Sequence, residues 1–343
     1  MSSSPRLRKF LRVTGISLAL LVATLSAAPY LIPLPGPDPV TAESLAPPGG
    51  RFETVAGSRT FLVEEGPKDG PAVVLVHGFG GSTFSFRKNV APLAASGLHV
   101  VTFDLPGFGL SDKRWDADYS HPAAADFVVA VMTRLGIPRA TLVGHSMGGN
   151  VIAHVAERHP EAVERMVFVA PSLFEGKAPG AGAFLLRCPP LRRWARIVVR
   201  WKLRPPGSGN TLRTAFGDPA LVTPEVVEGY AAPRRLADWD LALLGMARDL
   251  PRCGLTRPLS ALRVPVLVVW GDRDTWVPLS RGGKLRTELP GAEWFIVPGA
   301  GHLVLEEKPS EVDARLIGFL TVRTAASASA PSSPPASSLP RPR

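Results

Sequence analysis

One short motif in the chain has the residue types and spacing needed for covalent catalysis. Residues 144–148 read Gly-His-Ser-Met-Gly; they follow the apolar run 140–143 and precede a helix-like stretch. A serine hydroxyl becomes a useful nucleophile when a tight strand-to-helix turn lifts it clear of the backbone and an imidazole accepts its proton. Glycines at both ends of the motif let strand and helix approach closely at such a turn. The motif therefore predicts that Ser146 is the nucleophile of a hydrolase.

Four further motifs follow strand-like runs along the chain. They are His-Gly-Phe-Gly-Gly at 77–81, Asp-Leu-Pro-Gly-Phe-Gly at 104–109, Gly-Asp-Arg-Asp at 271–274 and Pro-Gly-Ala-Gly-His at 298–302. Helix-like runs alternate with these strands, at 86–96, 121–135, 147–158 and 311–323. The alternation predicts an α/β fold with a mostly parallel central sheet and helices on both faces. Ligand then binds at the carboxyl ends of the strands, where every one of these motifs falls.

Over residues 51–322 this ordered set of motifs resembles the α/β-hydrolase fold family, in its serine-nucleophile, esterase- or lipase-like branch with a cap. The resemblance implies a catalytic triad of Ser146, Asp274 and His302. His302 is expected to take the serine proton and deliver it to the leaving group, while Asp274 orients the imidazole. Asp272 is the rival acid, but in the family the acid usually ends a G-x-x-D turn, which favours Asp274.

The same resemblance implies an oxyanion hole made of two backbone amides. A tetrahedral intermediate carries negative charge on the former carbonyl oxygen and requires two convergent N–H donors near the nucleophile. These are expected to be the amides of Phe79 and Met147. His77 and His145 are interpreted as loop-organising residues. The histidine spacings match no zinc motif, so we predict neither a metal nor a cofactor.

The loop at 104–111 narrows the reaction class. Its sequence resembles the D-x-P-G-x-G-x-S loop of the epoxide-hydrolase and dehalogenase-like branch, where the nucleophile is commonly an aspartate. Ser146 departs from that pattern and argues against epoxide opening and dehalogenation. The predicted reaction is hydrolysis of a small-molecule ester or lipid-like substrate through an acyl-enzyme. Carbon–carbon bond hydrolysis, amide hydrolysis and perhydrolysis by the same triad stay open, as does a catalytically silent binding protein.

A long insertion separates the two halves of the predicted core, 51–172 and 261–323. Residues 173–260 have no clear strand pattern and are interpreted as a helical cap over the active site. Within them, the segment 187–204 is strongly basic and contains no acid. Its apolar residues at helical spacing are Leu191, Trp194, Val198 and Trp201, and the arginines along another side are Arg192, Arg196 and Arg200. Two interpretations are open: a solvated helix with its apolar side on the core, or a helix in contact with a membrane surface.

The N-terminal residues predict a membrane anchor. A basic leader, 1–12, precedes an apolar segment, 13–32, that is long enough to span a bilayer. Positive charge before it favours a cytoplasmic N-terminus, so the catalytic domain is expected on the extracytoplasmic side of the cell membrane. Cleavage of this segment as a signal peptide, giving a secreted or periplasmic protein, is the alternative. Residues 33–50, rich in proline and glycine, are expected to act as a linker.

The net charge bears on the expected partner, and the two cysteines bear on disulfide formation. The net charge of the 343-residue chain is +10, concentrated in the leader and the predicted cap, and no nucleic-acid-binding motif accompanies it. An anionic membrane surface is therefore the expected counterpart, and nucleic acid is not. Spacing alone leaves open whether the two cysteines, Cys188 and Cys253, form a disulfide. Residues 324–343 are expected to be a disordered tail, and the oligomeric state is left open.

Overall fold

The computed structural model describes residues 5–173, 182–203 and 207–321. Within them, eight strands form one sheet in the order β1-β2-β4-β3-β5-β6-β7-β8, and only the β1–β2 and β2–β4 pairs are antiparallel. The strands are β1 (Gly50–Val55), β2 (Ser58–Glu65), β3 (Ala72–Val76), β4 (His99–Phe103), β5 (Ala140–His145), β6 (Val163–Val169), β7 (Val266–Gly271) and β8 (Glu293–Val297). The predicted fold class, a mostly parallel α/β sheet, is confirmed.

Helices cover both faces of this sheet. The described helices are α1 (Pro5–Leu31), α2 (Val90–Ala95), α3 (His121–Arg134), α4 (Met147–Arg158), α5 (Pro189–Lys202), α6 (Gly207–Arg213), α7 (Pro224–Ala231), α8 (Leu241–Asp249), α9 (Gly282–Glu288), α10 (Val304–Glu307) and α11 (Pro309–Thr321). Alternate residues of β3 enter opposite cores: Val74 and Val76 pack with residues of α3 and α4, whereas Val73 and Leu75 pack with residues of α2 and α11. Burial on both faces explains why the central strands are continuous apolar runs.

One helix boundary differs clearly from the sequence prediction. A helix was expected from residue 86 to residue 96, but α2 begins at Val90. The preceding residues, Thr83–Phe86, instead form a 3-10 turn, which the Ser82 side chain caps by accepting a hydrogen bond from the amide of Phe84. A serine that bonds the backbone locally competes with regular helix at such a position.

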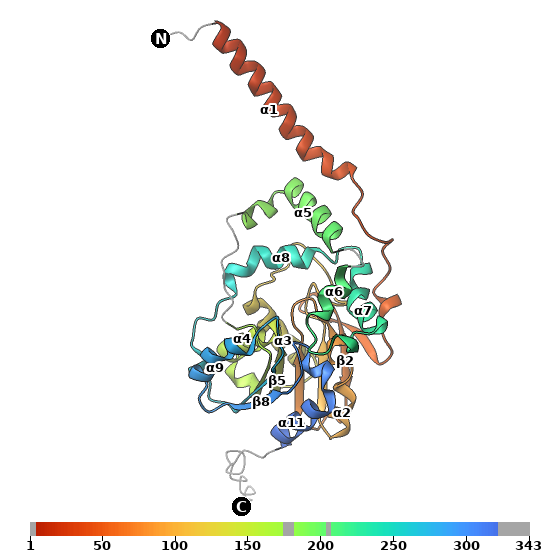
Figure 1. Cartoon of the computed structure of the whole chain (residues 1–343), viewed down its shortest axis with the longest axis vertical. Coiled ribbons are helices and arrows are strands. Elements are labelled where there is room, and N and C mark those ends of the chain that lie inside the picture. Colours follow the sequence, from red (N-terminus) through yellow and green to blue (C-terminus); the bar gives the residue numbers. More distant parts are fainter. Residues whose placement is uncertain (1–4, 174–181, 204–206, 322–343) are drawn as a thin grey trace, which may run out of the picture.

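The described residues between β6 and β7 form helices joined by turns and irregular segments. They contain α5 to α8 and short 3-10 turns, with no strand in the described part of 173–260. Figure 1 shows these helices gathered between α1 and the end of the sheet-containing part. Cys188 is exposed and Cys253 is buried, and both are free thiols. That these helices form a separate cap domain with the expected boundaries stays a prediction.

Helix α1 extends away from the rest of the chain (Figure 1). It begins at Pro5, inside the basic leader and earlier than the expected apolar segment 13–32, and Pro29 lies within it. Proline fits the first turn of a helix because its missing N–H has no partner there in any case. Among the described helices only α1 is long and apolar enough to cross a membrane: its Lys9–Leu31 stretch has a mean hydropathy of 1.8 and is not buried. The predicted tail, 324–343, lies outside the described residues.

Helix α5 turns its arginines, not its apolar residues, toward the protein. Arg196 and Arg200 both bind the fully buried carboxylate of Asp240, at 2.7 and 2.6 Å. The large apolar side chains that stay exposed on α5 are Leu191, Val198 and Trp201. The interpretation of a helix with its apolar side on the core is therefore wrong, because ion pairing to Asp240 fixes the opposite orientation.

Candidate active site

Ser146 occupies the sharp turn between β5 and α4. Its backbone has φ 53° and ψ −118°, a left-handed conformation that is costly for a residue with a Cβ. The glycines of the motif make this turn possible: a Cβ on Gly144 would collide with the backbone of Gly148, and one on Gly148 would collide with the carbonyl of Val76. The sequence thus builds a strained, tightly packed elbow at the position predicted for the nucleophile.

His302 and Asp274 meet at the carboxyl ends of β7 and β8. The His302 ring donates from Nδ1 to Asp274 Oδ2 at 2.8 Å, and both residues are buried. The other carboxylate oxygen of Asp274 accepts the amides of Trp276 and Val277, at 2.9 and 2.8 Å. These amides hold the carboxylate in place and leave one oxygen for the imidazole.

Asp272, the rival acid, has a different partner. Its carboxylate accepts the amide of Gly299 at 2.7 Å and so closes the turn that precedes His302. Among the two candidate acids, the geometry therefore assigns the imidazole contact to Asp274 alone.

The two other histidines of the motifs bond to loop backbone. His145 donates from Nε2 to the carbonyl of His302 at 2.9 Å, and the two rings lie 4.8 Å apart. His77 accepts the amide of Leu105 at 3.0 Å and donates to the carbonyl of Gly78 at 2.8 Å. Burial lowers the pKa of both imidazoles, that of His145 to about 3, so both rings are neutral at physiological pH.

The loop that contains Phe79 runs directly against Ser146. A Cβ built on Gly78 would lie 2.9 Å from the Cβ of Ser146, which only a glycine avoids. Within the described residues, neither the Phe79 amide nor the Met147 amide donates a hydrogen bond. Both N–H groups expected to form an oxyanion hole are thus unpaired: Met147 follows Ser146 directly, and Phe79 follows Gly78 in the loop that packs against Ser146.

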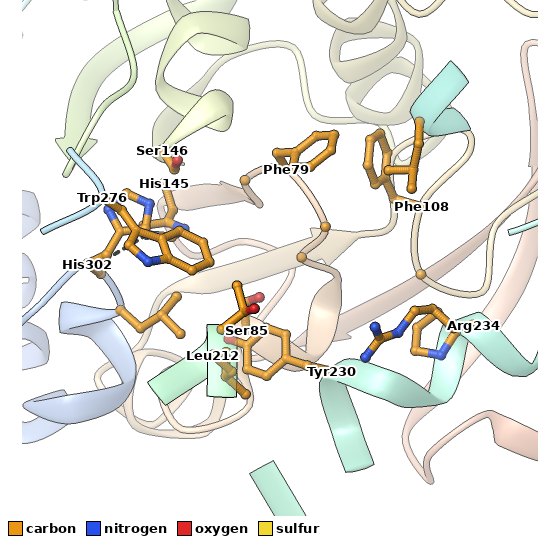
Figure 2. A pocket seen from close by; sticks show the side chains of 18 of the residues that line it. Phe79, Ser85, Phe108, His145, Ser146, Leu212, Tyr230, Arg234, Trp276 and His302 are labelled. Carbon is orange, nitrogen blue, oxygen red and sulfur yellow. Dashed lines mark hydrogen bonds between the residues drawn. The ribbon is translucent and has the colours of Figure 1, made fainter. Parts of the chain in front are cut away.

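Ser146 and His302 line one cavity of about 660 Å³. Figure 2 shows both at one side of this pocket, with Trp276 beside His302. Within the part of the chain that the structure describes, no hydrogen bond joins the Ser146 hydroxyl to the His302 ring. Hydrogen bonds between catalytic groups often shorten only when substrate binds. Among the described residues no three His, Cys, Asp or Glu side chains are grouped so that they could hold a metal ion.

Tyr230 lines the pocket and belongs to a buried network that the sequence motifs do not reveal. The Tyr230 hydroxyl donates to Glu306 at 2.9 Å, and Arg87 forms an ion pair with the same carboxylate. Burial and the nearby Glu306 raise the pKa of Tyr230, which keeps the phenol protonated. Tyr230 and Glu306 are 76 residues apart and follow no motif, so only their folded proximity identifies this network.

Comparison with known proteins gives the family. Residues 71–309 match the model of the α/β hydrolase fold. The uncharacterized hydrolase YugF of Bacillus subtilis strain 168 is 31% identical over 250 residues, which cover 72% of this chain and 89% of that protein. The 2-hydroxy-6-oxo-6-phenylhexa-2,4-dienoate hydrolase of Burkholderia cepacia is 29% identical over 265 residues, covering 73% of this chain and 88% of that enzyme.

One solved structure is similar over a larger share of the chain. It is a membrane phospholipase A described as a bacterial virulence factor, with a TM-score of 0.64 and 26% identity. The alignment covers 91% of this chain and 98% of that one, and so extends beyond the part that matches the family model. From its sheet, its relatives and its matched residues, the chain belongs to the α/β hydrolase fold family.

Proposed function

We propose that this protein is a serine hydrolase that cleaves carboxylic esters through an acyl-enzyme intermediate. The observation that carries the proposal is the arrangement around Ser146: a strained elbow, two unpaired amides beside it, and the hydrogen-bonded pair His302–Asp274 lining the same cavity. A pocket of this volume accommodates a small organic molecule. Its aromatic and aliphatic lining suits an acyl chain.

In the proposed mechanism Ser146 attacks the ester carbonyl carbon while His302 accepts the hydroxyl proton at Nε2. Asp274 stabilises the imidazolium, and the amides of Phe79 and Met147 bind the oxyanion of the tetrahedral intermediate. When the intermediate collapses, the carbon–oxygen bond of the leaving group breaks and His302 protonates the departing alcohol. Water, deprotonated by His302, then hydrolyses the acyl-enzyme and releases the acid.

The test is burst release of p-nitrophenol from p-nitrophenyl butyrate. Wild-type protein is expected to give a burst close to one equivalent per chain if deacylation is the slower step, and Ser146→Ala should lower turnover by at least about 10³-fold. Ser96→Ala, which removes a hydroxyl from an exposed turn, is the matched control. Ester turnover that is unchanged in Ser146→Ala contradicts the proposal.

Carbon–carbon bond hydrolysis by the same residues is the second candidate. It is favoured by the similarity to the dienoate hydrolase of Burkholderia cepacia. Incubation with a 2-hydroxy-6-oxo-dienoate separates the two candidates. Faster cleavage of this compound than of simple esters, measured as kcat/KM, would favour the second.

We further propose that α1 is an uncleaved anchor and that α5 lies on the same membrane. The two helices are joined where α1 ends: Trp194 donates to the carbonyl of Leu25 at 3.0 Å, and Arg193 donates to the carbonyls of Pro29 and Ile32, both at 3.1 Å. If α1 spans the bilayer, we expect α5 to lie at the lipid–water boundary because of these contacts. Its outward apolar side chains then meet lipid, and the catalytic part lies on the extracytoplasmic side.

Two measurements test this membrane proposal. Carbonate extraction should leave the protein in the membrane with its N-terminus intact, whereas a soluble mature chain that starts near Ala28 contradicts an anchor. Deletion of residues 1–32 should leave measurable binding to anionic vesicles, and replacement of Val198 and Trp201 by serine should then weaken that binding. Leu221→Ser, at another exposed apolar residue of the insertion, is the control. If the truncated protein and its variants bind vesicles equally, α5 does not contact the membrane as proposed.

A further inference from the structure

The described walls of the active-site pocket contain two cationic side chains and no carboxylate. Two cationic side chains, Lys113 and Arg234, are among the lining residues, and no described lining residue is an aspartate or glutamate. Most of the remaining lining is apolar or aromatic. An acyl chain alone needs no charge in such a pocket, so the two cations require a separate explanation.

Arg234 is the stronger of the two signals. It lies in the 3-10 turn Ala232–Arg235 and donates one hydrogen bond, to the carbonyl of Leu203 at 3.2 Å. Within the described residues it has no ion pair, and burial lowers its pKa although Glu228 acts against that shift. A guanidinium has five N–H donors, so most of its hydrogen-bonding capacity is left over.

Among the described residues, five other arginines of the insertion have a carboxylate partner. They are Arg196, Arg200, Arg235, Arg248 and Arg252. Partly buried arginines are normally compensated in this way, because an unpaired buried charge is costly. Arg234 is partly buried and forms no ion pair with any described carboxylate, and it lines the cavity, where an anion would fit.

Lys113 adds a second donor at the same pocket. Its ammonium group donates to the carbonyls of Gly109 and Ser111, at 2.8 and 2.7 Å, which leaves one of its three N–H groups. Burial lowers the pKa of Lys113 to about 8, although the negative charges of nearby carboxylates act to raise it. These carboxylates belong to Asp104, Asp112 and Asp238, and none of them forms an ion pair with the ammonium group. An anion in the pocket would favour the protonated form.

The position of Arg234 indicates which part of a substrate it meets. Figure 2 shows Arg234 across the pocket from Ser146 and His302, with Phe79 and Phe108 along one wall and Leu212 and Tyr230 along the other. A ligand that reaches from the serine to the guanidinium must therefore cross an apolar middle section. This spacing fits an amphiphile with its reactive carbonyl at one end and its charge at the other.

We propose that the pocket selects acyl esters that carry an anionic oxygen group, a phosphate or a carboxylate, at the end remote from the scissile carbonyl, and that Arg234 and Lys113 bind that group. This inference rests on the proposed ester hydrolysis. The phosphate would belong to the alcohol part of the ester and the carboxylate to the far end of the acyl part.

The experiment compares full-length protein in detergent on two matched substrate pairs. The first pair is dihexanoyl phosphatidate and dihexanoylglycerol, and the second is mono-p-nitrophenyl adipate and p-nitrophenyl hexanoate. For at least one pair, the ratio of kcat/KM for the anionic ester to that for the neutral ester should fall at least about tenfold in Arg234→Gln, mainly through KM. The pair that responds identifies whether the anion belongs to the alcohol or to the acyl part.

Three further variants separate charge recognition from damage to the fold. Arg234→Lys keeps the charge and should retain much of the anionic preference. Lys113→Met should lower it less than Arg234→Gln, since Lys113 has fewer donors left. Arg235→Gln changes the exposed neighbour, which pairs with Glu228 and does not line the pocket, and should leave the ratio at its wild-type value.

A binding measurement keeps this inference distinct from the proposed reaction. Calorimetry with hexyl phosphate should show binding to Ser146→Ala protein that weakens at least about tenfold when Arg234→Gln is added. Unchanged ratios for both substrate pairs, together with equal hexyl phosphate binding, overturn the anionic subsite even if neutral esters are hydrolysed. A different result would separate the two proposals: if no ester is hydrolysed but hexyl phosphate still binds in a way that depends on Arg234, the proposed function is wrong and the anionic subsite is supported.

Discussion

The two walls of the pocket are built on different physical principles. The wall at the strand ends, around Ser146 and His302, depends on backbone: glycines that admit close approach, unpaired amides and neutral buried histidines. The wall contributed by the residues between β6 and β7 depends on side chains, with arginines paired to a buried aspartate and apolar groups left outside. The first wall suits chemistry that requires fixed positions of the reacting groups, and the second is the one to which we assign the proposed recognition of substrate and membrane.

The largest expected effect is on the strand-end wall. Asp274→Asn should lower kcat for a p-nitrophenyl ester by about 10³- to 10⁴-fold, because the amide no longer holds His302 in the tautomer that accepts the serine proton. Asp272→Asn, two residues away, only alters the turn at Gly299 and should cost less than about tenfold. Equal losses in the two variants, measured with matched thermal stability, would contradict the assignment of the acid.

On the opposite wall the expected effect is on stability. Asp240→Ala should lower the free energy of unfolding by about 3–5 kcal/mol, or melt α5 locally, since it leaves Arg196 and Arg200 without their shared carboxylate. Hydrogen exchange of residues 189–202 and thermal melting measure this. Asp126→Ala removes an exposed partner of Arg158 and should cost less than about 1 kcal/mol. If both variants lose the same stability, the buried pair is not what orients α5.

A third prediction concerns the close packing of the elbow. Gly148→Ala should destabilise the protein by about 1–3 kcal/mol and impair catalysis, because the new methyl group meets the carbonyl of Val76. The control is Gly283→Ala in α9, where a Cβ meets no atom within 4 Å and helix propensity improves. The free energies of unfolding are measured by chemical denaturation. A larger loss of stability in Gly283→Ala than in Gly148→Ala would show that the elbow can accommodate the extra methyl group.

The smallest effect lies behind the strand-end wall, where Asp313 of α11 accepts a hydrogen bond from Asn89 at 2.8 Å. Burial raises the pKa of Asp313 to about 6, above the usual value near 4. The folded state therefore holds this proton more tightly, and the associated stability is present at pH 4 and is lost as pH rises through about 6.

Asp313→Asn should accordingly raise Tm at pH 7.5 by about 2–4 °C, equivalent to roughly 1 kcal/mol, with no gain at pH 4. The control is Asp126→Asn, whose carboxyl has its pKa lowered by Arg158 and should gain nothing at pH 7.5. A Tm gain for Asp313→Asn that is the same at both pH values would mean that burial does not perturb this carboxyl.

The strand-end wall could be predicted from the sequence far better than the helical wall. Its groups follow buried strands directly, so a local motif such as 144–148 carries the turn and its glycines together. The preference for Asp274 over Asp272 comes from the resemblance to the family, in which the acid usually ends a turn of this length. Local patterns suffice because the sheet brings the ends of its parallel strands to one edge.

The helical wall depends on pairs that are distant in sequence. Helical spacing correctly separates the arginines of α5 from its apolar residues, but it does not say which side faces the protein. That orientation depends on Asp240, about 40 residues further along the chain, and the proposed role of Arg234 depends on its having no ion pair among the described residues. Such contacts have no local signal, so only the folded structure reveals them.

The central claim is that Ser146 is the nucleophile and that His302 activates it. The most direct measurement is reaction with a fluorophosphonate probe followed by mass spectrometric mapping of the modified residue. We expect one adduct, on the peptide that contains Ser146, absent from Ser146→Ala and formed at least about 10³-fold more slowly in folded His302→Gln. An adduct on another residue, or a labelling rate that does not depend on His302, would contradict the account.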